Sequence, residues 1–202
     1  MKTLVHKYSS VFQSGIGKLK HFKAQFSLNK QPCYMKHRNV SYALREKVDK
    51  ERIQKADILE RIKCSEWASP IVPVVKKNGS VRICGDFKTT LNPTLKDENY
   101  PLPRIADIFA TLARGQRFSK VDLTQAYLRM EVHPDHRKYL TINTQQGLFQ
   151  YKCLPYVVTD APAKWQRVID TIQVMQDDLM IAQSNDSEYF KNLDAVLQRL
   201  KP

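Results

Sequence analysis

The pair Asn78-Gly79 constrains the fold of this chain more than any other feature, because it separates two runs rich in β-branched residues. These runs extend from Ile71 to Lys77 and from Ser80 to Phe87. Asn-Gly is the strongest short signal for a β-hairpin, since both residues tolerate a positive φ. We therefore predict a hairpin in which a two-residue turn joins these runs.

A second hairpin is predicted further along the chain. The runs from Tyr139 to Thr144 and from Leu148 to Cys153 alternate in polarity on either side of Gln145-Gln146-Gly147. This pattern predicts two strands and a three-residue loop. A further strand-like run starts at Arg117 and ends just before Asp122.

Helical spacing of apolar residues predicts four helices. They cover residues 42–62, 103–112, 161–172 and 186–200, and Gly115 follows the second of them. Trp165 falls on the apolar face of the third helix, which favours core packing over stacking against a nucleic-acid base. The predicted strands and helices together indicate an α+β fold, and 202 residues are enough to bury one hydrophobic core.

The charge of the chain indicates a polyanionic partner. The formal net charge is +13, and residues 1–45 contain nine Lys or Arg and no Asp or Glu. Nucleic acid is favoured over membrane, because no basic amphipathic segment ends in a hydrophobic anchor. In this acid-free extension Lys18, Lys20 and Lys23 are candidates for phosphate contacts, and a plain solvated extension is the alternative.

No apolar run approaches the roughly 20 residues needed to cross a membrane, and the N-terminus has no signal-peptide core. We therefore expect an intracellular protein, cytoplasmic or nuclear, with no membrane partner. Its four cysteines form no Cys-x-x-Cys pair, which argues against structural zinc and fits reduced thiols.

Three aspartates are the candidate catalytic residues. Asp122 follows a strand-like run, and the adjacent pair Asp177 and Asp178 interrupts the two apolar halves of a possible hairpin. Nucleotidyl transfer uses two divalent cations about 4 Å apart, and Mg²⁺ prefers carboxylate oxygens. Taken alone, an Asp-Asp pair is more often a solvated turn than a metal site.

Five blocks of sequence strengthen the interpretation of these aspartates as metal ligands. From about Tyr8 to Leu200 the chain resembles the fingers and palm of reverse transcriptases from gypsy-like LTR retrotransposons. The blocks, in the order found in that family, are S-E-W-A-S-P-I-V-P-V-V-K-K-N-G-S-V-R-I-C-G-D-F-K, Y-P-L-P-R-I, F-S-K-V-D-L-T-Q-A-Y, G-L-F-Q-Y-K-C-L-P and A-P-A-K-W-Q-R.

The resemblance implies a right-hand polymerase architecture with an antiparallel palm sheet backed by helices. Residues 1–63 would be a basic N-terminal extension and helix, and residues 64–202 the reverse transcriptase domain. The fingers would cover approximately 64–98 and 129–155, and the palm approximately 99–128 and 156–202.

The resemblance also implies roles for individual residues. The catalytic, metal-binding aspartates of the family correspond to Asp122, Asp177 and Asp178. The residue that distinguishes deoxyribose from ribose corresponds to Tyr127, since an aromatic ring there can fill the space of a 2′ hydroxyl. A ring packed in the palm core is the alternative for Tyr127.

Contacts to the incoming nucleotide are implied for a second set of residues. Lys76 or Lys77 would act as a point charge on the triphosphate, and Arg82 can hold phosphate oxygens with two hydrogen bonds. Tyr156, in the Pro155-Tyr156-Val157 triplet where the family has Pro-Phe-Gly, is also a candidate. Without the resemblance, the two lysines are typical of a solvated hairpin end.

The implied reaction is RNA-directed DNA synthesis with two Mg²⁺ ions, or Mn²⁺ in their place. The implied partners are an RNA template, a DNA primer and deoxynucleoside triphosphates. The oligomeric state is not indicated by the sequence.

The chain departs from the family in ways that predict impaired catalysis. About seven residues are missing before Asp177, so either the helix from Ala161 to Ile172 is shorter or Asp177 is displaced. Val157 replaces a glycine, and a β-branched residue cannot adopt the backbone angles open to Gly. Met175 replaces a Tyr, and the sequence ends before the thumb, which indicates a truncated copy.

Two alternatives to an active polymerase are consistent with these departures. One is a catalytically inactive nucleic-acid-binding remnant of a retrotransposon polyprotein. The other is a decayed reading frame that has no stable fold.

Overall fold

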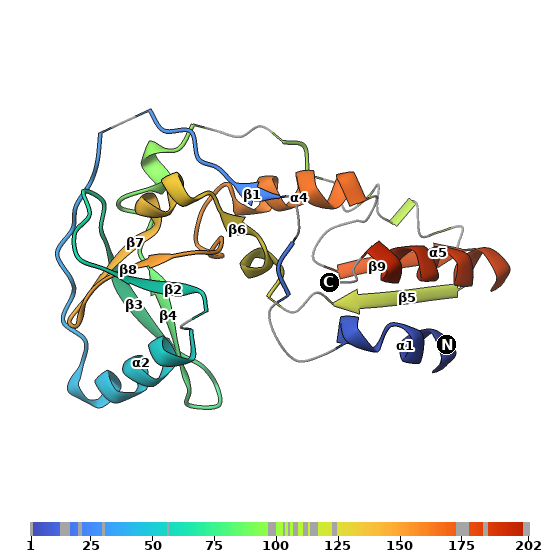
Figure 1. Cartoon of the computed structure of the whole chain (residues 1–202), viewed down its shortest axis with the longest axis horizontal. Coiled ribbons are helices and arrows are strands. Elements are labelled where there is room, and N and C mark those ends of the chain that lie inside the picture. Colours follow the sequence, from blue (N-terminus) through green and yellow to red (C-terminus); the bar gives the residue numbers. More distant parts are fainter. Residues whose placement is uncertain are drawn as a thin grey trace. The chain divides into compact units, whose positions relative to one another are not determined.

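The computed structural model forms two compact units, drawn in Figure 1. Unit 1 comprises Met1–Phe22, Glu98–Arg129 and Pro162–Pro202, and unit 2 comprises Lys23–Asp97 and Met130–Ala161. The structure describes residues 2–12, 17–19, 22–29, 31–55, 57–96, 100–102, 104, 106, 109–110, 113, 117–122, 125–172, 178–183 and 186–199. For the two strands of unit 1, the structure describes the backbone and, of the side chains, that of Ser119.

Unit 2 is built on a five-stranded mixed sheet. The strands are β2 (Leu59–Ile62), β3 (Ser69–Val75), β4 (Val81–Gly85), β7 (Thr141–Thr144) and β8 (Gly147–Tyr151). Their order is β2-β8-β7-β3-β4, in which β3 and β7 are parallel and the other neighbours are antiparallel. A short parallel pair, β1 (Lys23–Ala24) with β6 (Glu131–Val132), belongs to the same unit.

The hairpin β3–β4 confirms the prediction made from Asn78-Gly79, but its turn is different. The Lys76 amide donates to the Ser80 carbonyl at 2.8 Å, and the Gly79 amide donates to the Lys76 carbonyl at 2.9 Å. Gly79 has a φ of 75°, whereas Asn78 is not among the residues with positive φ. The loop therefore has three residues, a common alternative in which one left-handed glycine follows a simple turn.

The second hairpin, β7–β8, also forms, with a two-residue turn in place of the predicted three-residue loop. Thr144 pairs with Gly147, so Gln145 and Gln146 form the turn. Tyr139 lies in the 3-10 helix η4 (Pro134–Leu140) rather than in the strand. Pro134 at the start of η4 has a backbone angle suited to this helix and has no amide for a strand ladder.

The helix predicted over residues 42–62 is too long. Helix α2 extends over Tyr42–Gln54, and Leu59–Ile62 forms strand β2, which pairs with β8 from Leu59–Tyr151 to Ile62–Leu148. The amides of Ile58 and Leu59 both donate to the Lys55 carbonyl, which closes the end of the helix. Pairing with a distant strand overrides the helical tendency of this short segment.

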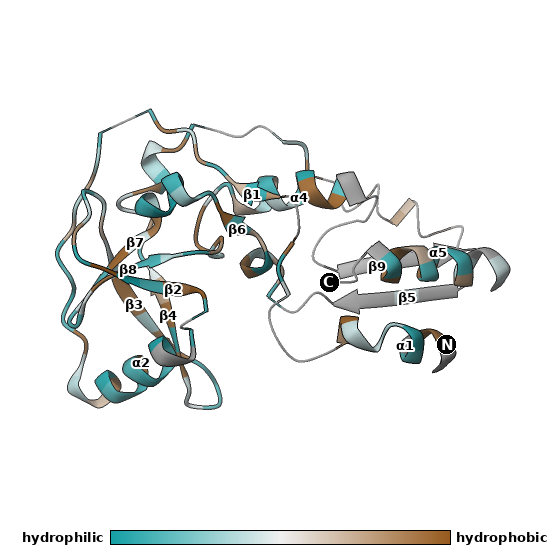
Figure 2. Cartoon of the chain, in the orientation of Figure 1, coloured by the Kyte–Doolittle hydropathy of each residue, from teal (hydrophilic) through white to brown (hydrophobic). Residues whose placement is uncertain are grey.

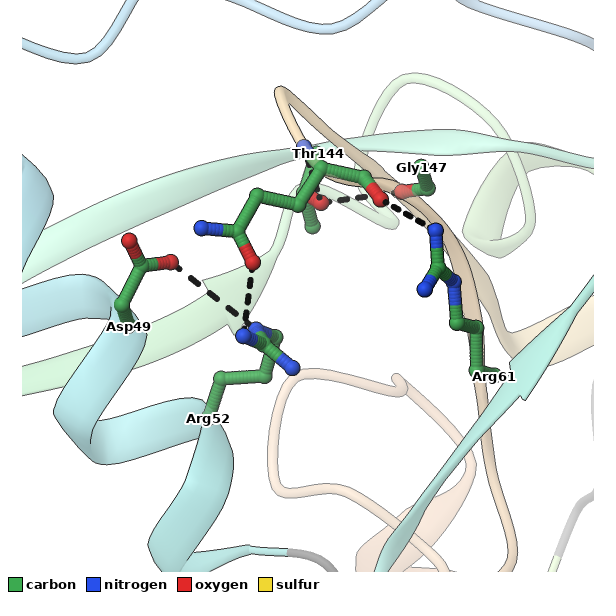
Figure 3. A network of polar contacts seen from close by, with 6 residues as sticks. Asp49, Arg52, Arg61, Thr144 and Gly147 are labelled. Carbon is green, nitrogen blue, oxygen red and sulfur yellow. Dashed lines mark hydrogen bonds and ion pairs between the residues drawn. The ribbon is translucent and has the colours of Figure 1, made fainter.

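Helix α2 is mostly hydrophilic in Figure 2, and its polar side chains tie it to the hairpin β7–β8. Arg52 donates from Nη2 to Oε1 of Gln146 at 2.6 Å and lies over the Phe149 ring at 5.0 Å. Arg61 of β2 donates to the Gln146 carbonyl, and Thr144 accepts from the Gln146 amide, as Figure 3 shows. Two arginines thus hold the tip of one hairpin.

Within its described residues, unit 1 contains a two-stranded antiparallel sheet and the α-helices α1, α4 and α5. The strands are β5 (Arg117–Asp122) and β9 (Asp178–Gln183), and the helices are α1 (Lys2–Lys7), α4 (Ala161–Ile172) and α5 (Asp186–Arg199). The first residue of α4, Ala161, is counted with unit 2. Short 3-10 helices complete the two units: η1 (Ser9–Phe12), η2 (Asn92–Thr94) and η3 (Ala126–Arg129).

The first residues of the basic extension pack against α5. Tyr8 is 3% exposed and forms a cluster with Tyr189, Leu193 and Leu197 of α5. Asp194, between them on the same helix, accepts hydrogen bonds from Lys7 Nζ at 2.7 Å and from Tyr8 Oη at 3.0 Å. This end of the extension is therefore part of unit 1.

The predicted helices 161–172 and 186–200 correspond to α4 and α5, and the α+β fold class is confirmed. The helix predicted over residues 103–112 lies largely outside the described residues. Among the residues that are described, no helix is long and apolar enough to cross a membrane.

Candidate active site

Two of the three candidate aspartates are paired across the sheet of unit 1. Asp122 at the end of β5 lies directly opposite Asp178 at the start of β9. Residues at opposite positions of an antiparallel pair have Cβ atoms about 4.5–5.5 Å apart and lie on the same face. Two carboxylates at that spacing suit a divalent cation, whose oxygen ligands lie at about 2.1 Å for Mg²⁺. The backbone register is therefore compatible with a metal site, and the role of Asp122 and Asp178 as metal ligands stays a prediction.

Helix α5 packs against one face of the sheet formed by β5 and β9. The Ser119 hydroxyl and the Tyr189 hydroxyl of α5 are in hydrogen-bond contact. Because successive residues of a strand alternate between faces, Asp122 is on the other face from Ser119. The backbone thus separates a face that packs against α5 from a face that carries the two aspartates.

Asp177 lies outside the described residues, so its position relative to Asp122 stays a prediction. Helix α4 extends to Ile172 in full, so the alternative of a shortened helix is wrong. Its regular hydrogen bonding persists because Trp165, Val168 and Ile169 are all buried on one face. Among the described side chains, which exclude those of Asp122 and Asp178, no three His, Cys, Asp or Glu residues form a metal-binding group.

Tyr127 lies in η3, five residues after Asp122, and is half-buried. Its ring lies edge-on to Trp165 of α4 with ring centroids 5.9 Å apart. Trp165 is 2% exposed, which confirms that it belongs to the core. Packing against Trp165 holds the Tyr127 ring in one orientation. A fixed ring is compatible both with a role in the core and with selection of the sugar.

Gln125 is a residue that the sequence did not single out. Its φ is 56°, and among the described residues it is the one non-glycine residue with positive φ. Non-glycine residues in the left-handed region cost free energy and are concentrated at functional sites. Here Gln125 immediately precedes η3, where the chain turns after the strand that ends at Asp122. Nothing in the side chain of Gln predicts this conformation.

The basic residues predicted to contact a nucleotide lie on the hairpin β3–β4 of unit 2. Lys76, Lys77 and Arg82 are exposed, and Arg82 pairs across the ladder with Val74. Lys47 of α2 donates from Nζ to the Gly79 carbonyl at 3.1 Å. Lys47 of α2 thus anchors the turn that carries Lys76 and Lys77.

In the triplet Pro155-Tyr156-Val157 of unit 2, Pro155 is buried and the next two residues form an exposed turn. Tyr156 is 44% exposed and Val157 is 41% exposed. Asn92 donates from Nδ2 to the Val157 carbonyl at 3.0 Å and accepts from the Thr159 amide. The backbone of Val157 is outside the left-handed region. In this chain Val157 therefore carries no backbone strain, and the effect of replacing the family's glycine on nucleotide or template binding stays a prediction.

Of the three lysines predicted to contact phosphate, two lie within the described residues. Lys18 and Lys23 are exposed, and Lys23 lies on β1, while Lys20 lies outside the described residues. Lys18 belongs to unit 1 and Lys23 to unit 2. Their joint role in binding nucleic acid stays a prediction.

Comparisons in sequence relate the chain to retrotransposon polyproteins. No protein-family model matches it. It is 36% identical over 98% of its length to an uncharacterized protein of Caenorhabditis elegans, K02A2.6. It is also 34% identical, over 66% of its length, to the transposon Tf2-3 polyprotein of Schizosaccharomyces pombe.

Comparisons in structure find a likeness in fold to a viral protein. The native prototype foamy virus protease-reverse transcriptase matches 98% of the chain with a TM-score of 0.82 and 21% identity. The foamy viral protease-reverse transcriptase in complex with an RNA/DNA hybrid matches the same share, with a TM-score of 0.85 and 19% identity. At these identities the likeness concerns the fold.

The chain spans a small part of each relative. It covers 17% of the C. elegans protein, 11% of the Tf2-3 polyprotein and 28% of the foamy viral chains. The similarity in sequence to the C. elegans protein and the likeness in fold both extend over nearly the whole chain. Together they identify the chain as a reverse transcriptase-like domain related to retroelement polyproteins.

Proposed function

We propose that this chain is the fingers and palm of a gypsy-like retrotransposon reverse transcriptase, which adds deoxynucleotides to a primer on an RNA template. The observation that carries the proposal is the register of β5 and β9, in which Asp122 lies opposite Asp178. Two carboxylates from strands far apart in the sequence, on one face of a sheet, are suited to bind divalent cations.

In this proposal Asp122 and Asp178, which face each other in the register, hold the metal, and Asp177 is the third ligand of the site. When bound, two Mg²⁺ ions, or Mn²⁺, would activate the 3′ hydroxyl of the primer and neutralise the triphosphate. The strands contribute rigidity, because a metal site on a sheet holds its ligands more precisely than a site on a loop. Tyr127, fixed against Trp165, would select deoxyribose by excluding a 2′ hydroxyl.

The nucleotide contacts are assigned to unit 2, which would be the fingers, while unit 1 would be the palm. Lys76, Lys77 and Arg82 are exposed on one hairpin and would bind the triphosphate. Tyr156, also exposed, would contact the nucleotide from its own turn. The net charge of +13 supports a template and primer as the nucleic-acid partners. Lys18, Lys20 and Lys23 would contact their phosphates.

The second candidate function is a catalytically inactive nucleic-acid-binding remnant. The connection between α4 and β9 favours it, because only residues 173–177 separate Ile172 from Asp178. The resemblance calls for about seven residues more before the aspartate pair. Metal catalysis tolerates little misplacement, since an error near 1 Å can cost on the order of 100-fold in rate.

Primer extension on an RNA template tests the proposal. The parent chain is compared with Asp122→Asn and Asp178→Asn, each in Mg²⁺ and in Mn²⁺, with Asp135→Asn as a control for an exposed aspartate outside the site. We expect extension by the parent and the control and none by the two site variants. If the parent binds primer and template but does not extend the primer with either metal, the polymerase proposal is wrong and the inactive remnant stands.

A further inference from the structure

The loop of the hairpin β3–β4 carries the one Asn-Gly pair of the sequence, Asn78-Gly79. We call residues 76–80 the hairpin tip, which is the loop that joins β3 and β4 in Figure 1. Asn78, Gly79 and Ser80 are all exposed. A Cβ at Gly79 would meet no atom within 4 Å, so the backbone at this residue is open to water.

An asparagine that precedes a glycine can cyclise, because glycine has no Cβ to obstruct the approach of its nitrogen. The Gly79 nitrogen, after losing its proton to water, forms a bond with Cγ of Asn78. The bond from Cγ to Nδ2 breaks, Nδ2 leaves as ammonia with a proton taken from water, and a cyclic succinimide remains. Water then opens the ring. Addition at Cγ gives an ordinary aspartate, and addition at the backbone carbonyl carbon gives isoaspartate.

Two hydrogen bonds at the hairpin tip point to the atom that becomes charged in this reaction. The Ser80 amide donates to Oδ1 of Asn78 at 3.1 Å, and the Ser80 hydroxyl donates to the same oxygen at 2.7 Å. Negative charge develops on Oδ1 when the Gly79 nitrogen attacks Cγ. Preorganised donors at about 2.7–3.1 Å from such an oxygen stabilise the charge, as in an oxyanion hole.

Positive charge at the hairpin tip favours the same step. Lys47 of α2 donates from Nζ to the Gly79 carbonyl at 3.1 Å, and Lys76 and Lys77 immediately precede Asn78. Residues 67–85 contain no Asp or Glu. Nearby cations favour the charged form of an acidic group, here the deprotonated Gly79 nitrogen and the intermediate that it forms.

One hydrogen bond opposes the reaction. The Gly79 amide donates to the Lys76 carbonyl at 2.9 Å and must release this bond before its nitrogen attacks. A hydrogen bond between neutral groups changes an equilibrium by a factor of about five. Because a hydrogen bond roughly doubles in strength when its acceptor becomes charged, each of the two bonds to Oδ1 gains a similar factor. The two gains outweigh the one loss.

We infer that Asn78 is a site of spontaneous deamidation, which the folded hairpin tip accelerates through Ser80. The formal net charge falls by one from +13, since a carboxylate replaces an amide. The new negative charge lies on the hairpin that also carries Lys76, Lys77 and Arg82. The inference goes beyond the proposed function, because the reaction consumes only water and requires no metal, primer or nucleotide.

Incubation of the full chain at neutral pH, followed by digestion and mass spectrometry, measures the amide lost at each asparagine. The folded chain is compared with the chain unfolded in guanidinium chloride. Ser80→Ala removes the hydroxyl donor, and Ser80→Thr retains one. Asn92 and Asn143 are internal controls in the same unit, whose side-chain amides donate hydrogen bonds to backbone carbonyls. Thermal melts verify that each variant is folded.

We expect the folded parent to lose the Asn78 amide about fivefold faster than the unfolded chain, with aspartate and isoaspartate both formed. Ser80→Ala should slow the folded reaction about fivefold, and Ser80→Thr should restore it. The parent and both variants should react at similar rates in denaturant, where Ser80 no longer holds Oδ1. Asn92 and Asn143 should stay intact in the folded chain.

A folded parent whose Asn78 reacts no faster than in denaturant would overturn the inference, since the hairpin tip would then protect the amide. Equal folded rates for the parent and Ser80→Ala would also overturn it, because the hydroxyl donor would have no effect. The comparison of folded and unfolded parent decides the matter even where Ser80→Ala does not fold. None of these outcomes depends on polymerase activity, because a chain without primer extension gains or keeps its amide mass in the same measurement.

Discussion

Gly79 is the residue whose backbone conformation most directly determines the tip of the hairpin β3–β4. Its φ of 75° lies in the left-handed region, and a Cβ at this position would meet no atom within 4 Å. The need for glycine is therefore purely a matter of backbone angles. The turn carries Lys76 and Lys77, so its geometry also positions the proposed nucleotide contacts.

The substitution Gly79→Ala is expected to destabilise the chain by about 1–2 kcal/mol, the cost of placing an L-residue with a Cβ in this region. Gly79→Asn is the matched control and should cost clearly less, because Asn tolerates left-handed angles. Urea denaturation of the two variants measures the difference. Equal losses for Ala and Asn would show that the backbone angle is not the cause.

At the scale of elements, the docking of α1 and η1 on α5 is the feature with the clearest energetic consequence. Tyr8 is buried against Tyr189, Leu193 and Leu197, while Phe12 at the end of η1 is 50% exposed. We expect Tyr8→Ala to lower the free energy of unfolding by about 3 kcal/mol, in the range for large-to-small substitutions in cores. Phe12→Ala, the matched control in the same segment, should cost less than 1 kcal/mol, as surface substitutions do.

Urea unfolding followed by tryptophan fluorescence measures both variants. If Tyr8→Ala and Phe12→Ala have the same stability, the segment does not pack on α5 in solution. The first twelve residues would then be free to act as part of a nucleic-acid-binding extension.

The same docking makes stability depend on pH. Hydrogen bonds from Lys7 and then Tyr8 hold the pKa of Asp194 below its ordinary value, and the bond to Asp194 raises the pKa of Lys7. A lowered acid pKa contributes stability above the unfolded pKa, and this is lost as the pH falls through the folded pKa. A raised lysine pKa contributes below the unfolded pKa and is lost as the pH rises through the folded one.

Melting temperatures of the parent and of Asp194→Asn across pH test this dependence. The difference between them should be largest near neutral pH and should shrink both in acid, as Asp194 is protonated, and in strong base, as Lys7 loses its proton. A difference that is constant over the whole range would mean that the ion pair does not contribute to folding.

Element bounds were predictable where the signal was local. Helix α4 begins and ends at the predicted residues, Ala161 and Ile172, because its apolar residues repeat with helical spacing and are buried. Strand β5 begins at the predicted Arg117 and includes Asp122, which was predicted to follow it. Leu59–Ile62 did not follow its helical pattern, because the edge of β8 offered hydrogen bonds that the sequence of residues 59–62 does not reveal.

At the scale of the whole molecule, the acid-free extension does not behave as one element. Lys2–Phe12 packs on α5 in unit 1, and β1 pairs with β6 in unit 2. Cys33 and Met35 form backbone hydrogen bonds with Ala68, also in unit 2. Most of the positive charge excess of the chain is thus distributed over two folded units. A plain solvated extension does not describe the parts that pack.

The sequence by itself determined the α+β class, the two hairpins and the helices α4 and α5, because turn residues and periodic burial act over a few residues. It also nominated Asp122 and Asp178 as candidate metal ligands. Only the tertiary structure decided that these two lie opposite each other, that Leu59–Ile62 is a strand and that Tyr8 is core. These facts depend on contacts between segments far apart in the chain, whose free energy no local pattern encodes.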